Sequence, residues 1–164
     1  MTEKPVPKRS RYSRILAALP AFPTCPTPVA GGRWQMGGCG RDEVEIRVDP
    51  RKGRGLYAKR RFEPGELILS APVLILNAAE CAVIDSTTLG HYYFHWDGDF
   101  DGIGRGALAL GAMTLCNHSL RPRARVDRDF AAERLDLRAL EPIAAGDEIT
   151  IDYGCELWFE AIEE

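Results

Sequence analysis

The chain has 164 residues, of which 45% are hydrophobic and 27% charged, enough to bury a core without disulfides or metal and too apolar for a fibrous or disordered protein. No window of about 18 consecutive residues is wholly apolar, so no membrane-spanning helix is expected. Residues 1–40 carry six Lys or Arg against one Glu, whereas the remaining 124 residues carry 15 against 23, and this acidic excess favours basic partners over nucleic acid.

The first 42 residues are rich in proline and glycine, which interrupt both helices and strands. They predict a flexible basic arm, with at most one or two helical turns at residues 13–19. The apolar stretch after Arg14 loosely resembles a signal or transit peptide, but Pro20 interrupts it, and we therefore expect no secretion.

The folded region is expected to span residues 43–160, with residues 161–164 as a short tail. Val44, Ile46 and Val48 alternate with charged residues, which predicts a half-buried strand. Further strands are predicted at residues 67–69, 73–76, 92–96, 107–110, 135–140 and 148–153, and helices at residues 79–85 and 156–164. Because strands and helices do not alternate regularly, the fold class is mainly β with a few short helices (α+β).

Two segments 81 residues apart have similar sequences. Residues 62–68 (FEPGELI) resemble residues 143–149 (IAAGDEI), and each predicts a glycine turn that leads into an apolar strand. Two copies are too few for a repeat architecture, so we interpret them as a short internal sequence similarity within one domain.

The five cysteines, at positions 25, 39, 81, 116 and 155, have neither an even number nor the clustered spacing of a disulfide framework or a zinc site. We therefore expect reduced thiols, no bound metal, and a cytoplasmic location (nuclear if the source is eukaryotic).

Three local motifs do not carry a function by themselves. Residues 53–58 fit the G-x-G-x-x-A dinucleotide pattern, but Pro64 follows too soon for the helix that this pattern requires. The acidic residues 97–102 lack the glutamate that completes a calcium loop. Cys116 lies near His118, but no third residue completes a catalytic triad, and a buried thiol is the simpler interpretation.

Three separated motifs nevertheless occur in a fixed order. They are residues 52–58 (KGRGLYA), residues 117–119 (NHS) with Pro122 downstream, and residues 146–154 (GDEITIDYG) followed by Trp158. Together they resemble the SET domain family of S-adenosylmethionine-dependent protein-lysine methyltransferases. The aromatic residues 92–96 (YYFHW) also resemble a strand of that family upstream of the second motif, so the resemblance covers about residues 43–160.

The resemblance implies a SET-type β-clip fold of several small twisted sheets with a C-terminal pseudoknot. It also implies S-adenosyl-L-methionine as the methyl donor, with glycine permitting a close approach of the backbone to it. The residues implied to bind this cofactor are Gly53, Arg54, Gly55, Asn117, His118 and Trp158. The residues implied to be catalytic are Tyr153, beside the methyl group and the acceptor amine, and Tyr92, as a wall for the lysine stem.

The implied reaction is an in-line transfer of a methyl group from a sulfonium to a neutral lysine amine. A free lysine has a pKa of about 10.4, so deprotonating it at pH 7 costs about 4.6 kcal/mol, which a dry channel and a nearby sulfonium would lower. Tyr153 is better suited to orient the amine than to remove its proton, because an ordinary phenol is protonated at pH 7.

The expected partner is a basic protein or peptide, such as a histone-like or ribosomal tail, received by an acidic groove. Neither direct nucleic-acid binding nor membrane binding is expected, and the oligomeric state is not predicted.

The sequence departs from the family pattern at three positions. Arg123 stands where the family usually has asparagine, which motivates the alternative of a catalytically impaired SET-like module that binds a basic peptide or the cofactor. Leu120 stands where many members have a zinc-binding cysteine, and Ile151 where an aromatic residue influences how many methyl groups are added. With no cysteine cluster beside the folded region, the chain resembles compact stand-alone members. A small-molecule or metal-binding β-clip domain is a third hypothesis, which leaves the three motifs unexplained.

Overall fold

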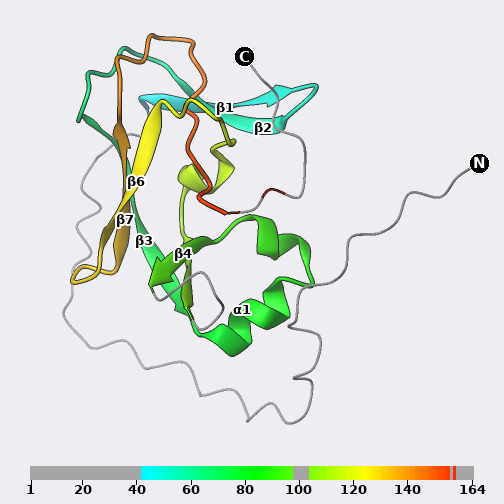
Figure 1. The fold of residues 1–164 in the computed structure, drawn as a ribbon. Helices are drawn as coiled ribbons and strands as arrows, with labels where there is room; N and C mark the ends of the chain where they lie inside the picture. Colours follow the sequence, from blue (N-terminus) through cyan, green and yellow to red (C-terminus); the bar gives the residue numbers. More distant parts are fainter. Residues whose placement is uncertain (1–41, 98–103, 156, 158–164) are drawn as a thin grey trace, which may run out of the picture. The chain divides into compact units, whose positions relative to one another are not determined.

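The computed structural model describes residues 42–97, 104–155 and 157, all of which belong to the unit Met36–Glu164. The predicted arm at residues 1–42, the predicted helix at residues 156–164 and the predicted tail therefore lie outside, or almost wholly outside, the described residues. The strands are β1 (Val44–Asp49), β2 (Gly53–Ala58), β3 (Leu67–Leu76), β4 (Phe94–Asp97), β5 (Arg105–Ala109), β6 (Ala124–Asp129) and β7 (Arg134–Ala139). The described helices are α1 (Ala78–Ile84) and the 3-10 turns Thr88–His91 and Ala112–Leu115. The prediction of a mainly β fold with few helices is confirmed (Figure 1).

The strands form two antiparallel sheets. β1 and β2 make a hairpin in which Val44 lies opposite Ala58, and the other five strands follow the order β4-β5-β3-β7-β6 (Figure 1). The predicted strand from Val44 is confirmed. The burial predicted for its apolar side chains is wrong at two positions, since Ile46 and Val48 are 51% and 76% exposed. Among the described residues, β1 and β2 form a sheet of their own, to which no further strand is added.

The two strands predicted at residues 67–69 and 73–76 are one continuous strand, β3. The N-terminal half of β3 pairs with β7 as far as Pro72, and the C-terminal half pairs with β5 from Val73 onward. Pro72 has no backbone N–H to donate, so it is tolerated at the point where the strand changes partners. Its carbonyl oxygen still accepts from the backbone N–H of Leu110 at 3.0 Å.

Of the other predicted strands, the one at residues 92–96 begins later than predicted, and the one at residues 148–153 is wrong. Tyr92 ends the 3-10 turn Thr88–His91, and β4 begins only at Phe94. Residues 148–153 do not form a strand of either sheet but make isolated bridges, one between Glu148 and Tyr57. β6 was not predicted because its charged sequence hides the alternation, and β2 because its glycines indicated only a turn.

The two similar segments form equivalent structures that pack against each other. Phe62 and Ile143 exchange both backbone hydrogen bonds, at 2.9 and 3.0 Å. The glycine that follows three residues later has a positive φ in each segment, 84° at Gly65 and 95° at Gly146. The amide of each glycine donates to an alanine carbonyl of the other half, so the sequence similarity is matched by an approximate two-fold symmetry of the backbone.

A single apolar core holds the motifs in place. Its largest fully buried apolar side chains are Leu56, Phe62, Ile68, Met113, Leu135, Leu137, Ile143 and Ile149. Each such side chain contributes roughly 1.5–3 kcal/mol by leaving water. Leu56 and Ile149 belong to the first and third motifs, so the core fixes both.

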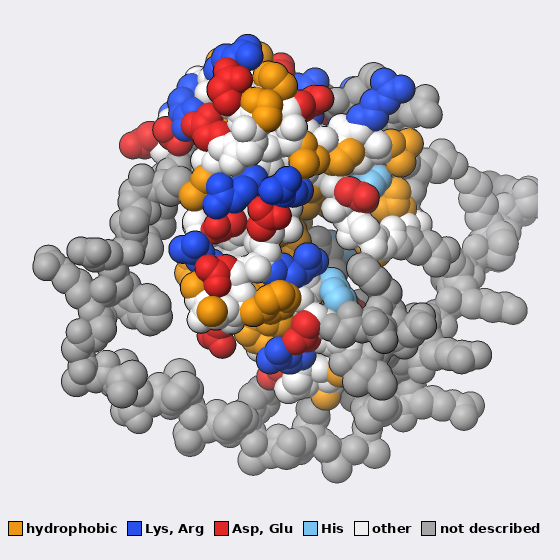
Figure 2. Space-filling view, turned by 60° about the vertical axis from the view of Figure 1, so that its left-hand side comes forward, with side chains coloured by type: hydrophobic (Ala, Val, Ile, Leu, Met, Phe, Trp, Pro, Cys, Tyr) orange, Lys and Arg blue, Asp and Glu red, His pale blue; other side chains and the backbone are white. Residues whose placement is uncertain are grey.

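The surface carries charges of both signs. Arg125, Arg134 and Arg138 each lie within 4.0 Å of an aspartate on β6 or β7, and Figure 2 shows acidic and basic side chains interspersed on one face. Among the described residues, no helix has the length and hydrophobicity needed to cross a bilayer.

Candidate active site

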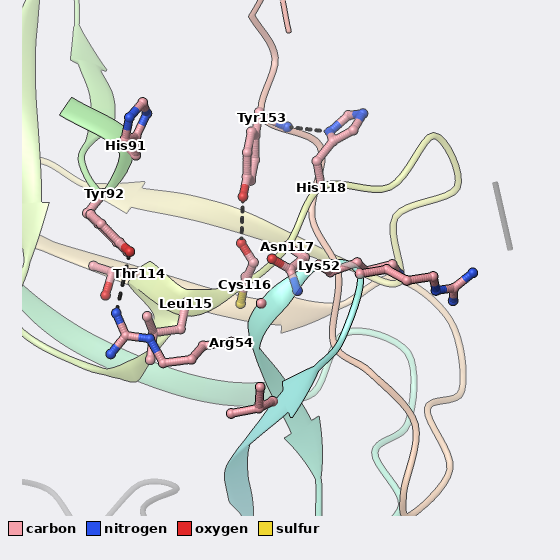
Figure 3. Close-up of a pocket in the computed structure, with 13 residues that line it drawn as sticks. Lys52, Arg54, His91, Tyr92, Thr114, Leu115, Cys116, Asn117, His118 and Tyr153 are labelled. Carbon is pink, nitrogen blue, oxygen red and sulfur yellow. Dashed lines mark hydrogen bonds between the residues drawn. The ribbon is translucent and has the colours of Figure 1, made fainter. Parts of the chain in front are cut away.

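The three motifs meet at a cavity of about 660 Å³. The turn between β1 and β2 forms one wall, and residues 91–92, 114–118 and 153 form the others (Figure 3). The predicted site residues that line it are Gly53, Arg54, Tyr92, Asn117, His118 and Tyr153. Gly55 lies buried next to them, and Trp158 lies outside the described residues.

Backbone hydrogen bonds hold the second motif against the third. The Ser119 amide donates to the Ile151 carbonyl at 3.0 Å, and the Ile151 amide donates to the Asn117 carbonyl at 3.0 Å. The Tyr153 amide then donates to His118 Nδ1 at 3.2 Å. Because Nδ1 accepts this bond, Nε2 is the imidazole nitrogen left to donate. The ring is fixed, since the His118 side chain is only 5% exposed.

The phenol of Tyr153 is held inside the cavity. Its hydroxyl donates to the carbonyl oxygen of Cys116 at 3.0 Å (Figure 3). Burial, followed by the nearby thiols of Cys116 and Cys155, raises the pKa of Tyr153 to about 12. The phenol is therefore protonated near neutral pH and is a poor general base.

A buried network that was not predicted lies behind the cavity wall. Glu148 Oε1 accepts from Asn117 Nδ2 at 2.7 Å, and Glu148 Oε2 lies 2.9 Å from Lys52 Nζ. Both charged side chains are almost buried, at 8% exposed for Lys52 and 9% for Glu148. A Cβ on Gly55 would stand 2.6 Å from Glu148 Oε1 and 2.9 Å from Asn117 Nδ2. Glycine at position 55 thus leaves room for this pair of side chains.

The charges that line the cavity are basic. Arg51 and Lys52 have carboxylate neighbours at 4.0 and 2.9 Å, whereas no carboxylate of the described residues lies within 4.0 Å of Arg54. The Arg54 guanidinium instead lies 3.4 Å from the hydroxyl of Tyr92. Within the described part of the chain, no Asp or Glu lines the cavity, so the cavity is suited to an anionic group of a ligand.

The predicted acidic groove is not found at this cavity, and it stays a prediction. Much of the acidic excess of the sequence lies outside the described residues, at Asp99, Asp101, Glu156, Glu160, Glu163 and Glu164. The described residues also contain no group of three or more His, Cys, Asp or Glu side chains arranged to hold a metal ion.

The SET domain family model matches residues 53–154, which contain all three motifs except Lys52. The chain belongs to the SET domain family. It is 31% identical over 121 residues to a Schizosaccharomyces pombe histone-lysine N-methyltransferase specific for H3 lysine-37, covering 73% of this chain and 79% of that protein. It is 29% identical over 107 residues to human histone-lysine N-methyltransferase 2B, covering 62% of this chain but only 4% of that protein.

A solved structure from Plasmodium falciparum, of a protein assigned as a histone methyltransferase, has the same fold. The TM-score is 0.54 at 22% sequence identity, covering 71% of this chain and 97% of that one. The family match and the S. pombe relative support protein-lysine methyltransferase activity for this chain, as the motifs predicted.

Proposed function

We propose that this SET domain transfers a methyl group from S-adenosyl-L-methionine to a lysine amine of a basic protein, with a histone-like or ribosomal tail as the substrate class. The observation that carries the proposal is the cavity in which residues of all three motifs meet around the hydroxyl of the half-buried Tyr153. The S. pombe relative, which acts on a histone lysine, supports this substrate class.

The residues of the cavity fit the cofactor. Its volume, about 660 Å³, lies within the usual range of roughly 300–1,000 Å³ for small-molecule sites. Arg54, which has no carboxylate neighbour among the described residues, would hold the α-carboxylate, while Asn117 and His118 offer hydrogen bonds to polar groups. When bound, S-adenosyl-L-methionine supplies an electrophilic methyl group on a sulfonium. The role of Trp158 beside the adenine stays a prediction.

Tyr153 acts in this proposal as an orienting group. Since its hydroxyl hydrogen is donated to the Cys116 carbonyl, its oxygen presents lone pairs that can accept from the N–H of an incoming amine. The high pKa of Tyr153 prevents it from taking the lysine proton, so that proton leaves to water before the amine reacts. Positioning of the two reactants then supplies most of the rate enhancement.

Tyr92 has a second role in this proposal, beside that of a wall for the lysine stem. Its hydroxyl lies beside Arg54 on one wall of the cavity (Figure 3). We assign to Tyr92 the task of holding the guanidinium toward the ligand, in addition to any contact with the lysine stem.

The alternative of a catalytically impaired module loses its motivation. Arg123 does not line the cavity and instead pairs with Asp147 of the third motif at 2.6 Å. The geometry of Asn117, His118 and Tyr153 around the cavity is therefore compatible with Arg123 in that position.

Binding and transfer are tested separately. Calorimetry with S-adenosylhomocysteine measures the cofactor site, and labelled S-adenosylmethionine with core histones or ribosomal proteins measures transfer. We expect R54M to weaken S-adenosylhomocysteine about 10-fold or more, because a charge-assisted hydrogen bond is lost, and to leave its decarboxylated analogue unaffected. R125M is the matched control, because Arg125 pairs with Asp127 and does not line the cavity. Absence of binding by the wild-type chain would reject the proposed function.

A further inference from the structure

The carboxylate of Glu148, in the third motif, contacts one residue of the first motif and one of the second. One oxygen accepts from the amide nitrogen of Asn117 at 2.7 Å and the other pairs with Lys52 at 2.9 Å. The three side chains come from positions up to 96 residues apart, and Lys52 and Asn117 both line the cavity (Figure 3). Glu148 itself does not line it.

This contact fixes which end of the Asn117 amide faces Glu148. An ionised carboxylate has no proton to donate, so only the NH₂ end of the amide can bond to it. The carbonyl end, Oδ1, is then left as a hydrogen-bond acceptor for another group. An asparagine without such a neighbour could present either end, which would halve the fraction of molecules ready for a given ligand.

Lys52 compensates the charge of this arrangement. A buried carboxylate without a counter-charge is strongly destabilising, and the Lys52 ammonium at 2.9 Å supplies that charge. Gly55 completes the cluster, because any Cβ at this position would collide with both Glu148 Oε1 and Asn117 Nδ2.

We propose that Glu148 is a positioning residue, which fixes the Asn117 amide so that its carbonyl oxygen accepts from an N–H group of the bound cofactor. The proposal rests on the proposed function, since it requires a ligand with an N–H donor in this cavity. Glu148 has no contact with the ligand and acts through Asn117.

The first test is E148Q, measured by calorimetry with S-adenosylhomocysteine and by thermal unfolding. The Lys52 ammonium can only donate, so the new glutamine turns its carbonyl oxygen to Lys52 and its NH₂ group to Asn117. The Asn117 amide is then reversed and presents its own NH₂ group to the ligand, so the dissociation constant is expected to rise about 10-fold. E43Q is the control, because Glu43 pairs with Arg60 away from the cavity, and its affinity should equal that of the wild type.

A role of the ion pair in stability alone is separated by the variant K52M/E148Q, which removes both buried charges. Because Lys52 lines the cavity, the reference for this variant is K52M. If the pair only stabilises the fold, K52M/E148Q binds S-adenosylhomocysteine as tightly as K52M, and the proposal is wrong. If Glu148 orients Asn117, K52M/E148Q binds more weakly than K52M. If E148Q does not fold, K52M/E148Q is measured in its place.

Exchanging donor and acceptor gives a rescue test. In N117D two carboxylates face each other, so binding is expected to be lost. In N117D/E148Q the new glutamine amide donates to one oxygen of the new carboxylate, whose other oxygen presents an acceptor to the ligand, so binding should be partly restored. Tighter binding by N117D/E148Q than by N117D supports the proposal, and equal or weaker binding overturns it. If the wild type binds S-adenosylhomocysteine and E148Q binds it equally well, only this inference is rejected. If the wild type does not bind it, the proposed function is rejected.

Discussion

Arg123 forms an ion pair with Asp147, with 2.6 Å between Nη1 and Oδ2. The contact joins the segment after the second motif to the third motif, where the Ala124 amide also donates to the Thr150 carbonyl at 2.9 Å. Arg123, which departs from the family pattern and does not line the cavity, thus joins the segment after the second motif to the third motif.

Replacing Arg123 with the asparagine usual in the family is expected to reduce stability without improving catalysis. Because the Arg123 side chain is 31% exposed, R123N should lower the free energy of unfolding by about 0.5–1 kcal/mol, and less at high salt. Urea unfolding at two salt concentrations measures this loss. An increase of methyl transfer well above the wild-type rate would mean that Arg123 does impair the site.

The two equivalent glycine turns should respond alike to substitution. Gly65 and Gly146 both have a left-handed backbone, and no atom lies within 4 Å of a Cβ placed on either. The cost of alanine is therefore conformational, about 1–2 kcal/mol at each position, and asparagine should cost less than alanine because it tolerates this conformation. Urea unfolding of G65A, G146A, G65N and G146N checks this, and a cost at only one of the two turns would contradict the symmetry.

The two glycines of the first motif should fail in different ways. In G55A the new Cβ strikes Glu148 and Asn117, so affinity for S-adenosylhomocysteine should drop at least about 10-fold. Gly53 has a φ of 80°, and no atom lies within 4 Å of a Cβ placed on it, so G53A should mainly lower stability. Calorimetry and thermal unfolding of both variants separate the effects. Equal affinity of G55A and wild type would contradict the close approach.

Stability should decrease in alkaline solution. Burial raises the pKa of the Cys116 thiol above its usual 9.0 and that of Tyr153 from 10.0 to about 12. The folded protein therefore holds both protons more tightly than the unfolded chain does, and this contribution, complete below pH 9, is lost as the pH rises through 9 to 12. Chemical unfolding across this range should show a shallower decline for C116A. The same slope in C116A and wild type would exclude the thiol as a cause.

Local pattern was sufficient for the elements whose stabilising contacts are close in sequence. The helix predicted at residues 79–85 is α1, whose start is fixed by a reciprocal cap between Asn77 and Glu80. β3 was predicted as two pieces because Pro72 normally interrupts a strand, and only the tertiary change of partner allows it to continue. Residues 148–153 alternate like a strand but bond to scattered partners at residues 56–57 and 117–124 instead of along one strand, which no local pattern reveals.

In the site, too, local motifs predicted some residues, whereas contacts between distant parts of the chain decided others. The motifs predicted six of the thirteen residues that line the cavity. Glu148 belongs to the third motif but was not predicted as a site residue, because it resembles an ordinary surface acid beside Asp147. Its partner Lys52 is 96 residues away, so neither burial nor pairing could be inferred from spacing. Arg54 was assigned to the cofactor and Tyr92 to the lysine, and their contact at 3.4 Å became evident only from the fold.

The most direct measurement of the central claim is methyl transfer from labelled S-adenosylmethionine to core histones or ribosomal proteins by the wild-type chain and by Y153F. We expect the wild type to methylate a lysine, and Y153F to be slower by about 100-fold because the amine is no longer oriented. S-adenosylhomocysteine should still bind to Y153F. Transfer by Y153F at the wild-type rate, or a wild-type chain that binds S-adenosylhomocysteine and methylates none of these proteins, would contradict the account.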